Sequence, residues 1–379
     1  MTELICPYCF ARAKRKELHL RCPEECRTDA EYFPGTAKRC PHGRESSTAR
    51  FCPHCHNRLE YDYITTKSRI VAMIGSRESG KSTYVGVLIH ELRNTVGAAF
   101  NGMSAELVGD NSRNRYRALF AGPMYARGET VAATNPIRAE RRLEPLLFML
   151  RFPKTRRSMI RRPRIRGLAM RDRLTAAMMI FYDTAGEDIL KEERLGRLAA
   201  YLDAADGIIF IVDPLQISSV RRAIGDSTPT PENAPDQIEM IQRLAELLRE
   251  RRKMTSAQKI STPLAIALTK TDALNGVLGD HSPLRQPGPH HGVYDDADGQ
   301  HVHDEARATL SAWTAGDNLL NTVNNNFSTY RYFGLSALGA PPTSKTQISP
   351  SGIHPLRVED PMLWLLGRFG QIRVRRAKR

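Results

Sequence analysis

A glycine-containing segment that begins at Gly75 constrains the fold of this chain more than any other feature. It reads Gly-Ser-Arg-Glu-Ser-Gly-Lys-Ser over residues 75–82 and follows directly after an apolar run at 70–74. A predicted strand followed by the spacing GxxxxGK[ST] is typical of a loop whose backbone N–H groups bind phosphate, and the next helix adds the positive end of its dipole. In such a loop Lys81 reaches the β and γ phosphates and Ser82 binds Mg2+. We therefore expect nucleotide phosphates to be bound by Gly75, Ser79, Gly80, Lys81, Ser82 and Thr83.

The chain after residue 65 alternates apolar runs with amphipathic segments. Strands are predicted at 70–74, 145–152, 176–182, 207–212, 263–268 and 330–335, and helices at 81–94, 235–253 and 361–369. Strands that alternate with helices indicate an α/β fold with a mostly parallel, doubly wound sheet. We expect this nucleotide domain to span residues 65–379, with insertions at 97–144, 153–173 and 273–328 and a basic C-terminal tail. Residues 1–64 are rich in cysteine and are expected to form a small module of their own.

Two segments at the ends of predicted strands indicate which base is bound. Thr269-Lys270-Thr271-Asp272 follows the run at 263–268, and Ser336-Ala337 follows the run at 330–335. The carboxylate of Asp272 can accept hydrogen bonds from N1–H and N2–H2 of guanine, a donor pair that adenine lacks. The stem of Lys270 would pack along the base plane, and the backbone at Ser336 and Ala337 would contact guanine O6. These residues and Thr269 predict a guanine site, with an ATP site as the alternative to be excluded.

A third segment, Asp183-Thr-Ala-Gly186, follows the predicted strand at 176–182. Asp183 can hold Mg2+ through a water molecule, and the unhindered N–H of Gly186 can contact the γ phosphate. A threonine that binds Mg2+ is expected between the first helix and the strand at 145–152. We assign this role to Thr134 and keep Thr130 as the alternate. The long segment at 97–144 suits a mobile functional loop of this kind with an inserted helix.

The four segments appear in the order GxxxxGKS, DTAG, TKTD and SAL, each after an apolar run. In this respect the chain resembles the P-loop GTPases of the TRAFAC class, which include translation factors and Ras-like proteins. It is similar in particular to bacterial GTPases of the double-GTPase type, which carry an N-terminal zinc ribbon and occur in predicted conflict or defence systems beside a second GTPase. The narrower resemblance rests on Cys6-Pro-Tyr-Cys9, on Cys52-Pro-His-Cys55, and on the segments at 183–188, 206–214 and 332–339. It implies a second GTPase as partner.

Departures from the Ras-like pattern bear on hydrolysis. Glu187 stands where those enzymes carry the glutamine that orients the attacking water. An ionised carboxylate is repelled by a γ phosphate, so Glu187 either acts as a base with a raised pKa or swings away. We expect slow intrinsic hydrolysis that a partner stimulates, with Lys81, Thr134, Gly186 and Glu187 as the catalytic set. Arg77 and Glu78 replace glycines of the loop, and Arg77 either contacts phosphate or pairs with Glu78.

All seven cysteines lie within the first 55 residues. In a chain expected to be cytoplasmic they predict zinc rather than disulfides, because C-P-x-C turns each present two thiolates and a tetrahedral site needs four ligands. With His42 the set provides eight ligands and so fills two structural sites. The sequential pairing, which we prefer, joins Cys6, Cys9, Cys22 and Cys26 on one ion and Cys40, His42, Cys52 and Cys55 on the other. A nested pairing would instead join Cys6, Cys9, Cys52 and Cys55.

The charge balance is 56 Lys and Arg against 41 Asp and Glu, a formal net charge of +15. The excess is concentrated at 153–173 and at the C-terminal tail. Such stretches attract nucleic acid, anionic lipid or an acidic protein, or else they are a solvated loop and a frayed tail. No apolar run approaches the ~20 residues of a membrane span, and the N-terminus lacks an apolar signal segment, so a cytoplasmic protein is expected.

The insertion at 273–328 falls into two parts. The first contains His290, His291, His301 and His303 near three aspartates at 295–298, and we predict a polar disordered loop there rather than a metal site. The second part, 304–327, is predicted to form helix faces of the core. Taken together, the sequence predicts a GTP-dependent switch whose zinc ribbon binds a partner. The alternative is a GTP-binding adaptor that does not hydrolyse GTP and binds nucleic acid through its zinc ribbon and basic loops.

Overall fold

A computed structural model of the chain describes residues 3–23, 26, 32–37, 39–45, 48–100, 102–132, 144–152, 176–182, 195–225, 236–289, 292–313 and 316–376. Its largest element is a seven-stranded sheet with the strand order β14-β12-β11-β7-β10-β9-β8. The strands of this sheet are β7 (Ser68–Gly75), β8 (Ser104–Leu107), β9 (Leu146–Arg151), β10 (Ala176–Phe181), β11 (Gly207–Val212), β12 (Leu264–Leu268) and β14 (Tyr330–Gly334). The five strands from β14 to β10 pair in parallel, whereas β9 and β8 are antiparallel. The expectation of an α/β fold with a mostly parallel sheet is therefore confirmed.

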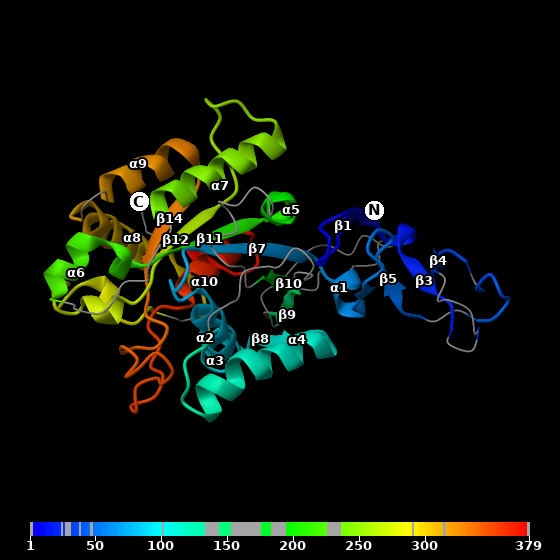
Figure 1. Cartoon of the computed structure of the whole chain (residues 1–379), viewed down its shortest axis with the longest axis horizontal. Helices are drawn as coiled ribbons and strands as arrows, with labels where there is room; N and C mark the ends of the chain where they lie inside the picture. Colours follow the sequence, from blue (N-terminus) through cyan, green and yellow to red (C-terminus); the bar gives the residue numbers. More distant parts are fainter. Residues whose placement is uncertain are drawn as a thin grey trace, which may run out of the picture.

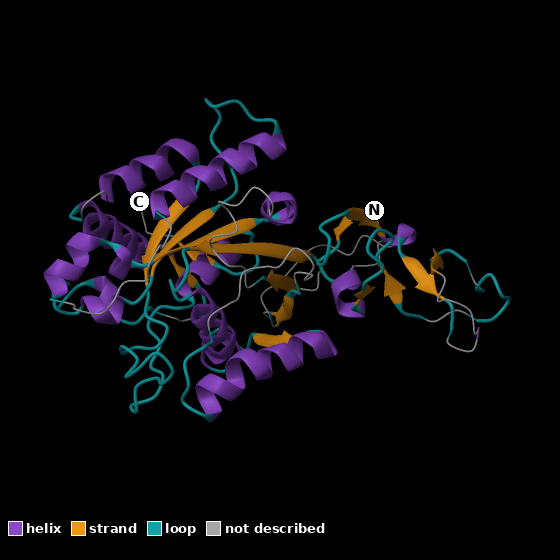
Figure 2. Ribbon diagram, in the orientation of Figure 1, coloured by secondary structure: helices purple, strands orange, loops and turns teal. Residues whose placement is uncertain are grey.

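Helices cover both faces of this sheet (Figures 1 and 2). The α-helices are α1 (Tyr61–Thr65), α2 (Lys81–Arg93), α3 (Thr95–Ala99), α4 (Gly109–Tyr116), α5 (Leu195–Ala204), α6 (Ser218–Ile224), α7 (Gln237–Arg252), α8 (Asp296–Ser311), α9 (Gly316–Asn326) and α10 (Asp360–Arg368). Shorter turns are the 3-10 helices η1 (Arg15–Glu17), η7 (Pro214–Gln216), η8 (Thr271–Leu274) and η9 (Pro283–Arg285), and η3 (Arg117–Ala126) is a π-helix. Because both faces are covered, β10, β11 and β12 are continuous apolar runs that are buried at every position.

The segment at 97–144 contains helical structure, as expected for an inserted helix, and also a strand that the sequence did not reveal. Its described residues form α3, the edge strand β8, α4 and η3. Strand β8 is only four residues long and pairs with β9 along its length. Its Ser-Ala-Glu-Leu sequence has no apolar run, so periodicity could not identify it.

The prediction of a polar disordered loop within 273–328 is wrong for the described residues. These form η9, the start of α8 and the short strand β13 (Tyr294–Asp295), which pairs with β15 (Val374–Arg375). Helices α8 and α9 bury Leu310, Leu319 and Val323, as expected for core helix faces. The C-terminal tail is not frayed as far as it is described, because Arg375 forms an ion pair with Asp295.

The N-terminal part consists of small antiparallel units beside the large sheet (Figure 1). Its strands are β1 (Glu3–Ile5), β2 (Arg12–Lys14), β3 (His19–Arg21), β4 (Tyr32–Pro34), β5 (Arg50–Phe51) and β6 (Arg58–Leu59). Strands β1 and β2 form a hairpin, and the others form a sheet with the order β4-β3-β5-β6. The hairpin side contributes Leu4, Phe10 and Leu18 to the same buried core as the large sheet. The far side has a small core of its own, formed by Leu20, Cys22, Phe33 and Cys40.

Among the helices that the structure describes, none is both long enough and apolar enough to cross a lipid bilayer.

Candidate functional sites

The loop between β7 and α2 has the geometry expected of a phosphate-binding loop. A Cβ on Gly75 would lie 2.8 Å from Ile211 Cβ and 2.9 Å from Ile211 O, so only glycine fits beside β11. Gly80 has a φ of +88°, which also favours glycine. Lys81 lies over the loop, with Nζ donating to Gly75 O at 2.8 Å and to Ser76 O. Ser82 and Thr83 follow in the first turn of α2, so the predicted phosphate-site residues lie together.

The segment at 269–272, which is predicted to bind the base, is hydrogen-bonded directly to this loop. Thr269 Oγ1 donates to Ser79 O at 3.0 Å, and Lys270 Nζ donates to Glu78 O at 3.1 Å. Lys270 adopts a left-handed backbone with a φ of 55°, which turns the chain sharply at the end of β12. Two segments that lie 190 residues apart in sequence, at Ser79 and Thr269, are thus joined by a hydrogen bond at the ends of β7 and β12, the parallel strands on either side of β11.

Asp213 is a site residue that sequence reasoning missed. It follows β11, its side chain is only 1 % exposed, and its Oδ2 lies 2.7 Å from Lys270 Nζ. Gln216 extends the contact, because its Nε2 donates to Asp213 Oδ2 at 3.3 Å and to Arg77 O at 3.0 Å. Gln216 Oε1 also accepts from Ser76 Oγ at 2.6 Å. The signal in the sequence was a carboxylate directly after a buried strand. In the structure Asp213 connects the segment at 269–272, called the base segment below, to the phosphate loop in one hydrogen-bond network.

Asp272 and Ser336 also meet, as the guanine hypothesis requires. Ser336 Oγ donates to Asp272 Oδ1, and the N–H of Gly339 donates to Ser336 Oγ at 2.8 Å. Ser336 and Leu356 exchange backbone hydrogen bonds of 3.0 and 2.8 Å, which fix the turn that contains Ala337. The carboxylate of Asp272 is therefore oriented from the strand end at β14.

The predicted switch residues Thr134, Asp183, Gly186 and Glu187 lie outside the described residues. The alternate threonine, Thr130, is described. Its Oγ1 donates to Lys345 O at 2.6 Å and its N–H donates to Thr346 O at 3.0 Å. The segment that leads toward Thr134 is thus paired with the loop that follows Ser336.

A buried guanidinium fixes the connections around the base segment. Arg357 has a side chain 1 % exposed and a left-handed φ of 53°. Its Nη1 donates to Asp298 Oδ2 at 2.8 Å and to Asp360 Oδ2 at 2.9 Å, and its Nε donates to the carbonyls of Pro283 and Gln286. Burial lowers the pKa of Arg357, but hydrogen bonds and attraction from the two carboxylates outweigh it and raise the pKa above its ordinary value.

Replacing Arg357 with methionine is expected to destabilise the fold by about 3 kcal/mol, because two carboxylates lose their buried partner. Urea unfolding followed by circular dichroism measures the difference. Arg113→Met is the matched control, since Arg113 forms an exposed pair with Asp110 and should cost less than about 1 kcal/mol. Equal losses in the two variants would contradict a structural role for the buried ion pair.

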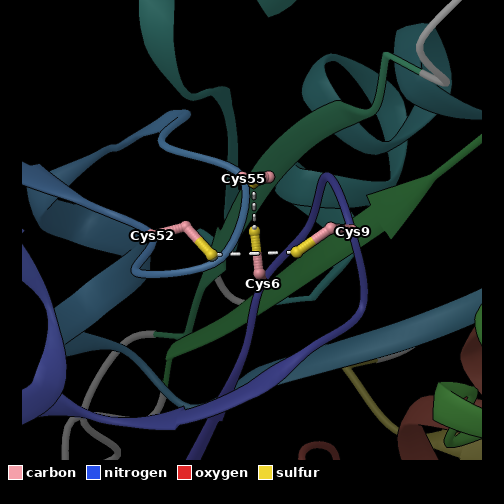
Figure 3. Close-up of side chains that lie close together, drawn as sticks. All are labelled: Cys6, Cys9, Cys52 and Cys55. Atoms are coloured by element: carbon pink, nitrogen blue, oxygen red, sulfur yellow. Dashed lines mark hydrogen bonds between the residues drawn. The ribbon is translucent and has the colours of Figure 1, made fainter.

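The cysteines form two groups of four ligands. In the first group, Cys6, Cys9, Cys52 and Cys55 have ligand atoms that all lie within 4.8 Å of one another. Their side chains point toward a common centre (Figure 3), with Cys6 Sγ 3.6 Å from Cys55 Sγ and Cys9 Sγ 3.7 Å from Cys52 Sγ. A tetrahedral zinc with Zn–S bonds of about 2.3 Å requires sulfur atoms separated by about 3.8 Å. The first cluster fits this requirement.

Two matching turns present the first cluster. The N–H of Phe10 donates to Cys6 O at 2.9 Å, and the N–H of His56 donates to Cys52 O at 3.0 Å. Both turns end in a left-handed residue, with φ of 61° at Phe10 and 55° at His56. In each turn a backbone N–H also points at the first sulfur, at 3.4 Å in both cases.

The second cluster joins Cys22, Cys26, Cys40 and His42. Cys26 Sγ lies 3.9 Å from Cys40 Sγ, and Cys22 Sγ lies 3.6 Å from His42 Nδ1. These separations also suit a tetrahedral zinc with three sulfur ligands and one nitrogen ligand.

The preferred sequential pairing is therefore wrong, and the ligands group in the nested arrangement. The reason lies in β3, which is antiparallel to β5 with His19 opposite Phe51. Cys52 follows β5 and so lies at the beginning of β3, whereas Cys22 follows β3 and lies at its other end. Because these two ends of β3 hold different ligand groups, Cys52 joins Cys6 and Cys9, whereas Cys22 joins Cys40.

The thiols of the first cluster shift one another's pKa values in opposite directions. The pKa of Cys6 is raised far above its ordinary value, chiefly by a hydrogen bond with Cys52. The pKa of Cys55 is held far below its ordinary value, chiefly by a hydrogen bond with the same residue. Thiols this close cannot all ionise unless a positive charge lies among them. Four thiolates around one cation are the arrangement that the spacing of the sulfur atoms accommodates.

Comparison with known proteins yields one substantial sequence relative. No protein-family model matches the chain. The chain is 26 % identical over 345 residues to the "Putative ESX-1 scaffolding and assembly protein SaeC" of Mycolicibacterium smegmatis, and the match covers 86 % of this chain and 81 % of that protein. This identity is too low to assign the chain to a family.

Solved structures with some likeness include two GTP-binding proteins. The Arl6 BBS3 small GTPase of Trypanosoma brucei, with the analogue GppNp bound, is 14 % identical, with coverage of 81 % of this chain and 99 % of that chain and a TM-score of 0.33. Era of Aquifex aeolicus, bound to GDP·AlF4−, is 12 % identical, with coverage of 80 % and 57 % and a TM-score of 0.30. Likenesses this low assign no activity, so the function is argued from the chain's own residues.

Proposed function

We propose that this chain binds GTP and hydrolyses it as a molecular switch. The observation that carries the proposal is the junction of the two predicted ligand segments: Thr269 and Lys270 are hydrogen-bonded to the loop at Ser79 and Glu78. Asp272 lies three residues after Thr269 and is oriented by Ser336. A phosphate loop and a carboxylate suited to guanine N1–H and N2–H2 therefore lie on neighbouring, hydrogen-bonded segments, as the binding of a single guanine nucleotide requires.

The residues of this site have different proposed roles in nucleotide binding. In the proposed complex Lys81 exchanges its backbone acceptors at Gly75 and Ser76 for the β and γ phosphates. Bound Mg2+, held by Ser82, would neutralise charge that develops on the phosphates. Asp213 and Gln216 keep the base segment and the phosphate loop at a fixed separation. The proposed contribution of Thr134, Asp183, Gly186 and Glu187 is to sense the γ phosphate and position water, and Glu187 makes slow intrinsic hydrolysis the expectation.

We further propose that both cysteine clusters bind structural Zn2+ and that the N-terminal part is an adaptor for a partner protein. Four protein ligands close each site, which suits a structural rather than a catalytic ion. The partner proposed from the sequence resemblance is a second GTPase, in a bacterial conflict or defence system. The name of the sequence relative, which mentions scaffolding and assembly, is also consistent with a switch that governs a protein assembly.

A second candidate is a GTP-binding adaptor with negligible hydrolysis that binds nucleic acid. Glu187 favours it, because a carboxylate replaces the residue that orients water in Ras-like enzymes. The name of the relative also describes a scaffold. The concentrated basic residues at 153–173 and in the tail supply charge for nucleic acid, although Arg375 is already paired with Asp295.

Three measurements test these proposals. Fluorescent GTP should bind the zinc-loaded chain with Mg2+ and be displaced by GTP and GDP but not by ATP, and Lys81→Ala should abolish the signal. Multiple-turnover phosphate release should then exceed that of Ser82→Ala for the switch and equal it for the adaptor. Displacement by ATP and GTP alike would refute the guanine assignment. Binding of mixed RNA or DNA that weakens steeply with salt would support the adaptor.

A further inference from the structure

We propose that Phe10 is a positioning residue for the nucleotide site: it fixes Tyr182, the residue before Asp183, and thereby links the first metal cluster to the switch. The inference rests on the proposed function. In this proposal Phe10 does not itself contact the nucleotide. Its basis is a three-ring contact between the N-terminal part and the central sheet.

Three aromatic rings meet where the hairpin packs on the sheet. The ring of Phe10 lies 5.2 Å from that of Tyr182, at an interplanar angle of 62°, and 5.6 Å from that of Tyr201. Tyr182 and Tyr201 are themselves in edge contact at 4.6 Å and 67°. Edge-to-face and tilted pairs at these distances stabilise one relative orientation of the rings. Each ring therefore restricts the other two.

Tyr201 connects this contact to the strand that carries the phosphate loop. Its hydroxyl donates to Val71 O at 3.0 Å and accepts from the N–H of Met73 at 3.2 Å, and both partners belong to β7. The ring of Tyr182, the residue after β10, lies in edge contact with that of Tyr201. Tyr201, in α5, thus contacts β7, the residue that follows β10 and the Phe10 ring.

Tyr182 depends on ring packing for its position. It is 1 % exposed, and its hydroxyl has no hydrogen-bond partner among the residues that the structure describes. A hydroxyl without a partner contributes no directional restraint, so the contacts with Phe10 and Tyr201 determine where the side chain lies. Because Asp183 is the next residue, the position of Tyr182 sets where the chain leaves β10.

The first cluster in turn determines the position of Phe10. Phe10 directly follows Cys9, its N–H donates to Cys6 O, and its left-handed φ of 61° is costly for a phenylalanine. A metal ion that joins Cys6 and Cys9 to Cys52 and Cys55 would stabilise this turn. The metal state of the cluster would therefore reach the nucleotide site through one side chain.

The second turn provides a matched control. His56 holds the same place after Cys55 and has the same left-handed backbone, but it stacks on Tyr32 at 4.2 Å and on His19 at 5.7 Å. It faces the small sheet β4-β3-β5-β6 rather than β10. Phe10→Ala and His56→Ala therefore remove equivalent rings that differ in what they contact.

The test compares wild type, Phe10→Ala, Phe10→Leu and His56→Ala, each with its zinc content measured. In Phe10→Ala we expect faster hydrogen exchange in peptides that cover 176–182, and about a tenfold rise in the Mg2+ concentration needed to slow GDP release. Phe10→Leu, which keeps most of the volume, should be intermediate and guards against misfolding of the alanine variant. His56→Ala should match wild type, and all four should bind equal zinc.

The outcomes separate this inference from the proposed function. If wild type binds no guanine nucleotide, the proposed function fails, while the exchange measurement still reports on the ring contact. If guanine nucleotides bind but Phe10→Ala shows the Mg2+ response of His56→Ala, the positioning role is overturned. The same holds if Phe10→Ala lowers zinc content, since the effect would then arise from the cluster itself.

Discussion

Asp272→Asn is expected to weaken GTP binding by about three orders of magnitude and to make XTP the preferred nucleotide. The carboxylate accepts two hydrogen bonds from guanine, and a hydrogen bond to a charged group contributes about 1.5–3 kcal/mol. The asparagine amide presents one acceptor and one donor, and the donor suits the carbonyl that xanthine carries at C2. Ser336 would still orient the side chain, because its hydroxyl can donate to the amide oxygen. Competition of GTP, XTP and ATP against fluorescent GTP or XTP measures the change.

A neighbouring carboxylate controls for charge and stability. Asp280 lies on the same connection, is 90 % exposed and pairs with Arg285, so Asp280→Asn should leave GTP affinity within about twofold. A variant Asp272→Asn that retains wild-type GTP affinity, or that loses GTP and XTP alike while remaining folded, would argue against base reading by Asp272.

Much of the proposed nucleotide site was predictable because it depends on local sequence. Strands buried on both faces appear as continuous apolar runs, and the residues that follow them must meet at one edge of a parallel sheet. The positions of Gly75, Lys81, Thr269 and Asp272 followed from that rule. Asp213 obeys the same rule and was missed: the segment at 206–214 contributed to the family resemblance, but its carboxylate was given no role of its own.

The parts that sequence could not specify depend on contacts between distant segments. The nested grouping of cysteines follows from which end of β3 meets β5, and nothing in the spacing of the cysteines determines that pairing. Gln216 reaches Ser76 across 140 residues, and Phe10 reaches Tyr182 across more. Such contacts arise from tertiary packing, so periodicity and motif spacing contain no signal for them.

If both cysteine clusters bind zinc as proposed, loss of the metal from one should affect the rest of the chain differently from loss of the metal from the other. Residues around the first cluster, among them Leu4, Phe10 and Leu18, belong to the core of the large sheet, whereas the second cluster has a separate small core. Structural zinc binding is coupled to folding, with apparent free energies of about 10–16 kcal/mol in small zinc peptides. Loss of either ion should therefore unfold its surroundings, but only the first cluster shares its surroundings with the nucleotide site.

Cys52→Ser and Cys40→Ser make this comparison with one lost ligand each. Cys52→Ser should release one zinc ion and lower the free energy of unfolding of the large domain, the part that contains the seven-stranded sheet, by about 3 kcal/mol through lost packing. This loss lowers the thermal midpoint of that domain by roughly 6–12 °C and speeds GDP release. Cys40→Ser should also release one zinc ion, yet leave the midpoint of the large domain and its nucleotide binding unchanged. Metal analysis, calorimetry and GDP release kinetics on the full chain distinguish the two variants. Equal effects on the midpoint would mean that the N-terminal part folds as one unit. That result would contradict a specific link from the first cluster through Phe10 to Tyr182.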